Sequence, residues 1–95
     1  MFVLHIGLPV ADGMGNSLEQ TFIDEFRPAI SAQEGFRDVQ LLRSADDQPD
    51  YCLVIAFASQ EQQKKWVASD LHQQVWPALA KNCQDFILRT YNSIS

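Results

Sequence analysis

The fold is decided by residues 57–79, which read FASQEQQKKWVASDLHQQVWPAL. Ser59 can cap a helix, and Gln62 three residues later completes a capping box with it. Ser69 can cap a second helix, and Asp70 behind it suits the positive end of a helix dipole. The stretch therefore predicts the end of a buried strand, a short helix, and a second helix after Ser69.

Three large ring side chains fall within this stretch: Trp66, His72 and Trp76. His72 and Trp76 are four residues apart, so they share one face of the second helix. The rings can line a ligand pocket, form a subunit interface or pack in a core. Pro77 is expected to bend or divide the second helix, whose apolar stripe is formed by Val67, Leu71, Val75 and Leu79.

Four other segments have the character of strands. The apolar runs 2–10 and 51–58 scarcely alternate, which is typical of strands buried on both faces. Residues 36–43 alternate in part, and the turn-rich residues 44–50 join them to the following run as a hairpin. Residues 86–94 form a final strand.

One further helix is expected between the first two strands, capped by Asn16 or Ser17. Pro28 should kink its last turns, and Gly35 should stop it. Its apolar stripe consists of Leu18, Phe22, Ile23, Phe26 and Ile30.

The resulting order is strand, helix, strand, strand, helix, strand. This is the ferredoxin-like βαββαβ arrangement of the α+β class, a four-stranded antiparallel sheet with its helices on one face. We expect one domain, residues 1–95. Because strands 2–10 and 51–58 look apolar on both faces, the uncovered face should be buried by a second copy of the chain. A homodimer through the sheet face is therefore expected.

The composition argues against several classes of partner. The net charge is −5, and the seven basic residues do not cluster, so neither nucleic acid nor an anionic membrane surface is expected as a partner. No apolar run approaches the roughly 20 residues of a spanning helix, and residues 1–10 lack the features of a signal peptide. Cys52 and Cys83 have no metal-ligand spacing. We expect free thiols in the reducing cytoplasm, with a disulfide as the other reading.

Segments spread over the whole chain resemble one known family. They are the first strand at 2–10, FRPAI at 26–30 leading to EGF at 34–36, LLRS at 41–44, FAS at 57–59, and Trp66 ahead of SDLH at 69–72. This pattern is similar to the antibiotic biosynthesis monooxygenase domain of the dimeric α+β barrel superfamily. The resemblance implies a homodimer whose sheets meet, with a pocket between sheet and helices in each subunit.

The resemblance also implies a range of activities. Family members include oxygenases that oxidise anthrone-like or quinol substrates without metal, flavin or heme, while others degrade heme or isomerise small phosphorylated carbonyl compounds. The heme-degrading members carry a heme-ligand histidine ten residues after their tryptophan, where this chain has Trp76, and an asparagine in the first strand. Residues 4–8 contain no asparagine, so the resemblance does not extend to heme degradation.

The candidate catalytic residues are His72, Trp66 and Arg89. Imidazole titrates near neutral pH, so His72 can act as a general base, or else it only stacks on its neighbouring ring. Trp66 resembles the pocket tryptophan of the family, and its alternative is a packed helix anchor. Arg89 could stabilise an enolate or phenolate if it points inward, or form an ion pair at the interface. The candidate substrate-binding residues are Trp66, Trp76, Phe22 and Phe26.

His5 alternates with Leu4 and Ile6, which places it on the other face of the sheet. If that face is the dimer contact, His5 is an interface histidine, and a catalytic role is the other reading. His5 and His72 alone do not make a metal site.

We expect a cofactor-independent monooxygenase with a quinol- or anthrone-type aromatic substrate. The alternatives are a non-catalytic dimeric binding protein for an aromatic or apolar metabolite, and an isomerase of the same superfamily. The surroundings of His72 discriminate between them, because a base must face an enclosed cavity, whereas a binding protein tolerates a histidine that is stacked away.

Overall fold

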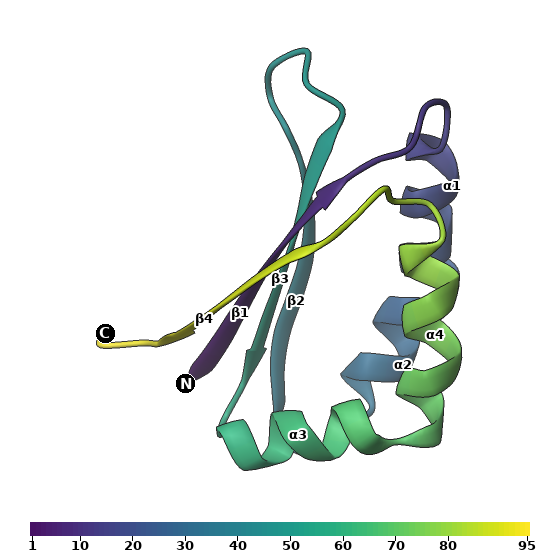
Figure 1. Cartoon of the computed structure of the whole chain (residues 1–95). Helices are drawn as coiled ribbons and strands as arrows, with labels where there is room; N and C mark the ends of the chain where they lie inside the picture. Colours follow the sequence, from purple (N-terminus) through teal and green to yellow (C-terminus); the bar gives the residue numbers. More distant parts are fainter.

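The computed structural model describes the whole chain, residues 1–95, as a four-stranded sheet with helices on one side of it (Figure 1). The elements, in chain order, are β1 (Phe2–Pro9), α1 (Gly15–Thr21), the π-helical turn η1 (Phe22–Phe26), α2 (Arg27–Ser31), β2 (Phe36–Arg43), β3 (Asp50–Phe57), α3 (Gln60–Ala68), α4 (Asp70–Ala80) and β4 (Ile87–Asn92).

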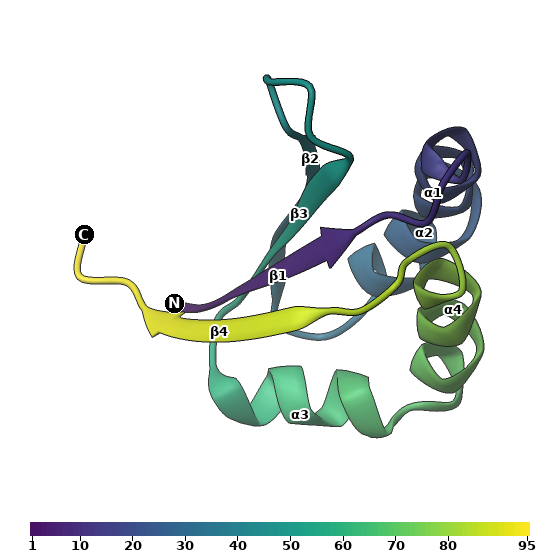
Figure 2. The ribbon, with the colours of Figure 1, turned by 45° about the horizontal axis from the view of Figure 1, so that its top comes forward.

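The sheet has the strand order β2-β3-β1-β4, and every pair is antiparallel. This is the predicted ferredoxin-like α+β architecture. Both views place α1, α2 and α4 together at one side, while α3 lies apart from them (Figure 2). The helices and the sheet therefore form two layers, and the space between α3, α4 and the sheet is where the candidate site lies.

The core lies between these two layers. Every second residue of β1 and β3 is buried on the helix side, as the period of a strand requires. The opposite face is open: His5 is exposed, and Val3 and Val54 are only half-buried. Within one chain the two strands are thus covered on a single face, so the expected burial of the second face depends on a partner. The largest core side chains are Trp66, Tyr51, Phe26, Phe57, Phe22 and Phe2.

The two serine caps are where the sequence predicted them. The Ser59 hydroxyl accepts a hydrogen bond from the backbone N–H of Gln62, and the Ser69 hydroxyl accepts one from the N–H of His72. Of the bend or division expected at Pro77, the division does not occur, because α4 runs unbroken to Ala80.

The predicted stripe of the second helix is half right. Val75 and Leu79 are buried, but Val67 and Leu71 are 39% and 43% exposed. Val67 belongs to α3, and the extended backbone at Ser69 separates it from α4. A stripe that continues the helical period across this break therefore does not exist.

The start of α1 also differs from the prediction. Met14 is at the N-cap position without a side-chain cap, so the caps expected at Asn16 or Ser17 are wrong. At Gly15 a β-carbon would lie 3.2 Å from the Tyr51 hydroxyl. The helix thus begins where the chain passes close to β3, which is a tertiary contact rather than a local signal.

A π-helical turn takes the place of the predicted kink near Pro28. The N–H of Arg27 donates to the carbonyl of Phe22, five residues earlier. Pro28, which has no backbone N–H to donate, follows directly after this turn. The wider turn interrupts the helical stripe, and Ile23, expected in the core, is 45% exposed.

Candidate functional site

An apolar cavity of about 200 Å³ lies between the sheet and helices α3 and α4. An engineered cavity of about 150 Å³ lined by apolar side chains holds benzene, so this cavity has room for an aromatic ring. Deeply buried Phe26 and Trp66 lie at its base, and the exposed side chains of Phe86 and Leu88 lie at its rim beside β4. The lining residues are Leu4, Ile6, Phe26, Ile55, Gln63, Trp66, Val67, His72, Trp76, Phe86 and Leu88.

A chain of ring contacts runs along the cavity. Trp66 meets Phe26 edge-to-face at 6.0 Å and His72 at 5.1 Å between ring centroids. His72 stacks on Trp76 at 6.2 Å with an angle of 15° between the rings, and Trp76 meets Phe86 edge-on. His72 and Trp76 do share one helix face, as their spacing predicted, and the structure brings both to Trp66.

The Ser69 hydroxyl holds the two halves of this site together. It donates to the backbone carbonyl of Trp66 at 2.6 Å and accepts from the backbone N–H of His72 at 3.2 Å. The Ser69 side chain therefore caps both the last turn of α3 and the first turn of α4. The relative position of the indole and the imidazole depends on this joint.

The imidazole of His72 is in an environment that favours its neutral form. Partial burial lowers the pKa of His72 below its usual value of 6.5, because the charged form loses hydration. Its Nδ1 atom is buried and has no hydrogen-bond partner in the chain. A neutral imidazole at the wall of an apolar cavity can accept a proton from a bound molecule.

Gln63 is a cavity residue that the sequence analysis missed. Its side chain makes no hydrogen bond within the chain and lines the cavity with Trp66. Its spacing could have indicated this, because Gln63 is three residues before Trp66 and residues three apart lie on one face of a helix. Its amide can donate to, or accept from, a ligand oxygen.

Two predicted site residues lie elsewhere. Phe22 is buried but lines a different hollow, and its ring stacks on that of Phe26 at 6.2 Å between centroids. Arg89 pairs with His5 across β4 and β1, on the face of the sheet that points away from the helices. Neither side chain is therefore in the cavity that holds His72, Trp66, Trp76 and Phe26.

The chain has neither a cluster of metal ligands nor a disulfide. No group of three or more His, Cys, Asp or Glu side chains is arranged to hold a metal ion. Cys52 and Cys83 are unpaired. None of the helices has the length and apolar character needed to cross a membrane.

Known proteins match the chain through its family and its fold. The family model described as antibiotic biosynthesis monooxygenase matches residues 1–77. No curated protein matches the sequence.

Three of the similar solved structures illustrate the shared fold. A candidate antibiotic biosynthesis monooxygenase from Nitrosomonas europaea has a TM-score of 0.86 at 14% identity, with 100% of both chains covered. One from Caulobacter crescentus has a TM-score of 0.86 at 17% identity, covering 99% of this chain and 90% of the other. SnoaB of Streptomyces nogalater, described as a cofactor-independent oxygenase, has a TM-score of 0.84 at 16% identity, covering 99% of this chain and 94% of the other. At these identities the likeness establishes the fold.

Proposed function

This chain belongs to the antibiotic biosynthesis monooxygenase family, and from that premise we propose that it is a cofactor-independent monooxygenase of a quinol- or anthrone-type aromatic. The observation that carries the proposal is a partly buried imidazole with an unpartnered ring nitrogen at the wall of an apolar, ring-lined cavity. SnoaB, which shares the fold, is described as a cofactor-independent oxygenase, and this supports the reaction type.

In this proposal the cavity holds the aromatic substrate between ring side chains. Trp66 and Trp76 pack against the substrate ring, with Phe26 beneath it, because aromatic pairs prefer edge-to-face and offset arrangements. Gln63 offers its amide to a ring oxygen. The apolar lining excludes water, which strengthens every polar contact made inside.

The reaction begins with proton transfer to His72. The imidazole accepts the proton of a substrate hydroxyl or of an acidic ring methylene, which leaves an electron-rich anion in the cavity. The anion itself donates an electron to O₂, and recombination forms the new carbon–oxygen bond. For a methylene substrate, one CH₂ group and one O₂ give one carbonyl and one water. The substrate supplies all the electrons, so no external reductant is required.

A second candidate, a binding protein without turnover, is favoured by one observation. His72 stacks on Trp76, and no carboxylate accepts a hydrogen bond from its ring to orient it. A cavity of this kind can retain an aromatic metabolite without deprotonating it.

Parallel titrations of one sample separate the two functions. Quenching of tryptophan fluorescence by 1,8-dihydroxyanthrone or 1,4-naphthohydroquinone under nitrogen measures binding, and an oxygen electrode measures turnover with the same ligands. A monooxygenase gives saturable quenching together with oxygen uptake above the autoxidation rate. Saturable quenching with uptake at the autoxidation rate would assign the binding function instead.

We propose in addition that the chain forms a homodimer through the open face of the sheet. That face carries Val3, Val54 and Ile87 beside His5 and Arg89, and Ile87 is 62% exposed. Large apolar surfaces of this kind are usually covered by a partner. A second copy packed sheet against sheet would cover them in both subunits.

A further inference from the structure

A second hollow, of about 700 Å³, lies between the α1–η1–α2 segment and the β2 edge of the sheet. We will call it the β2 groove, and we propose that it binds a small apolar monocarboxylate, with the carboxylate on Arg27. The residues that carry this proposal are Phe22, Ile23, Leu41 and Arg27, with Glu19 at the other end.

The π-helical turn puts Arg27 into the β2 groove. Because the turn is closed by a bond between residues five apart, Phe22 and Arg27 come to the same side of the helix. The guanidinium carbon of Arg27 lies 5.7 Å from the centre of the Phe22 ring. Such turns make up well under 1% of residues and are frequent at functional sites.

The guanidinium of Arg27 has no partner within the chain. The single ion pair of the protein joins Arg43 to Glu19, and the carboxylate of Asp24 is engaged by Gln20. Arg27 is the unpaired cation that lines the β2 groove. The planar fork of a guanidinium matches a carboxylate and binds it with two parallel hydrogen bonds.

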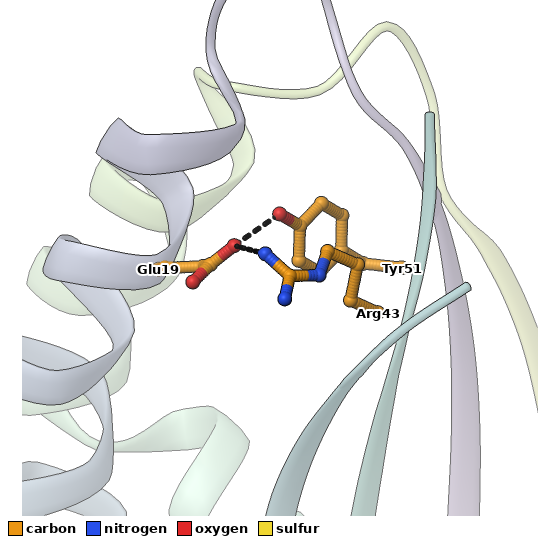
Figure 3. Close-up of polar contacts among 3 residues, drawn as sticks. All are labelled: Glu19, Arg43 and Tyr51. Carbon is orange, nitrogen blue, oxygen red and sulfur yellow. Dashed lines mark hydrogen bonds and ion pairs between the residues drawn. The ribbon is translucent and has the colours of Figure 1, made fainter. Parts of the chain in front are cut away.

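The other end of the β2 groove is already occupied by a carboxylate of the chain. Figure 3 shows the side chains of Arg43 and Tyr51 meeting that of Glu19, which pairs with Arg43 at 3.3 Å and accepts a hydrogen bond from the Tyr51 hydroxyl. Burial, and then the Glu19 carboxylate, raise the pKa of Tyr51, so its hydroxyl stays protonated. At this end the Glu19 carboxylate already neutralises Arg43, so Arg27 is the cation of the β2 groove that is left for the carboxylate of a ligand.

Apolar side chains line the space between the two ends. Ile23, which is 45% exposed, and Leu41, which packs against the core from β2, would be covered by a bound ligand. Glu19 and Arg27 are eight residues apart, which is about 12 Å along a helix at 1.5 Å per residue. That length accommodates an acid built on a two-ring aromatic.

The experiment is a titration of ¹⁵N-labelled protein with 2-naphthoate, followed by amide chemical shifts. We expect saturable shifts in residues 19–27 and 41–45. The neutral isostere 2-naphthamide should bind roughly tenfold more weakly, as should 2-naphthoate to an Arg27→Gln variant, because one charge-assisted contact is lost. Arg37→Gln removes an exposed arginine of β2 that does not line the β2 groove, and it should bind as the parent does.

Three results would overturn the proposal. They are the absence of saturable shifts in residues 19–27, equal affinity of the Arg27→Gln and parent proteins, and equal affinity for the acid and the amide. Shifts confined to Trp66, His72 and Trp76 would place the acid in the other cavity and would count against the β2 groove as well. Oxygenase activity is not needed for this test, so its outcome is independent of the proposed function.

Discussion

His72 is placed by backbone hydrogen bonding, and its partial burial lowers its pKa and so favours the neutral imidazole. The cap from Ser69 fixes its backbone, and contacts with Trp66 and Trp76 fix its ring. No charged partner holds the imidazole in its protonated form, so burial alone sets the direction of its pKa shift. A proton acceptor of this kind should reveal itself in the pH dependence of both catalysis and stability.

The acidic limb of the pH profile of kcat/KM should fall below pH 6.5, since the free enzyme needs a neutral His72. The free energy of unfolding should depend on the protonation of the same group. The unfolded chain takes up a proton near pH 6.5 but the folded chain only at lower pH, so the contribution of His72 is complete above 6.5 and is lost as the pH falls below it. Urea unfolding between pH 5 and pH 8 measures this, and the His72→Gln variant should lack the His72 component. An acidic limb above pH 6.5 would contradict the assignment.

Gly35 offers a prediction on backbone geometry. Gly35 and Gly13 both have positive φ, 81° and 74°, but only at Gly35 would an added β-carbon overlap another side chain, that of Gln62. Gly13→Ala should cost about 1 kcal/mol from the left-handed conformation alone. Gly35→Ala should cost distinctly more in urea unfolding, and Gln62→Ala in that background should recover part of the difference. Equal losses at the two glycines would show that the overlap relaxes freely.

Among the helices and strands, the joint between α3 and α4 has the clearest functional consequence. Ser69→Ala and Ser59→Ala each remove one helix cap, so each should lower the free energy of unfolding by about 1 kcal/mol. Only Ser69 bonds to both Trp66 and His72, so only Ser69→Ala should also reduce kcat. Unfolding and oxygen-uptake measurements on the two variants form a matched pair. A similar kcat for both would remove Ser69 from the site.

The strands and the capped helices could be predicted because their signals are local. The bounds of β1, β2 and β3 lie within one residue of those expected, and Ser59 and Ser69 act as the sequence indicated. The start of α1 could not be predicted, because the approach of Gly15 to Tyr51 is a contact between distant residues. Gly35 shapes the turn before β2, while the helix that it was expected to stop ends at Ser31.

The site was predicted in part for the same reason. His72 and Trp76 are four residues apart in one helix, and the structure places both side chains on the same face of α4. The turn η1 interrupts the helical period between Phe22 and Phe26, so only Phe26 reaches the cavity. The face occupied by Arg89 depends on how β4 pairs with β1, and a single sequence does not specify that register.

For the whole molecule, the main question is what covers the open face of the sheet, and we propose that a second copy of the chain covers it. Val54 lies on this face directly opposite His5. Val54→Lys should place a charge inside the sheet-to-sheet contact and yield a folded monomer in analytical ultracentrifugation. Leu71→Lys, an exposed position on the helix side, should leave the dimer intact. A parent protein that sediments as a monomer would reject this interface.

The most direct test of the proposed monooxygenase is oxygen consumption with 1,8-dihydroxyanthrone by the parent protein and by two variants of α4, without added cofactor. His72→Gln removes the proton acceptor, and Gln74→Ala alters an exposed residue of the same helix. A general base predicts uptake above autoxidation in the parent and in Gln74→Ala, with a loss of about 100-fold or more in His72→Gln. Uptake by His72→Gln as rapid as that of the parent would contradict His72 as the base.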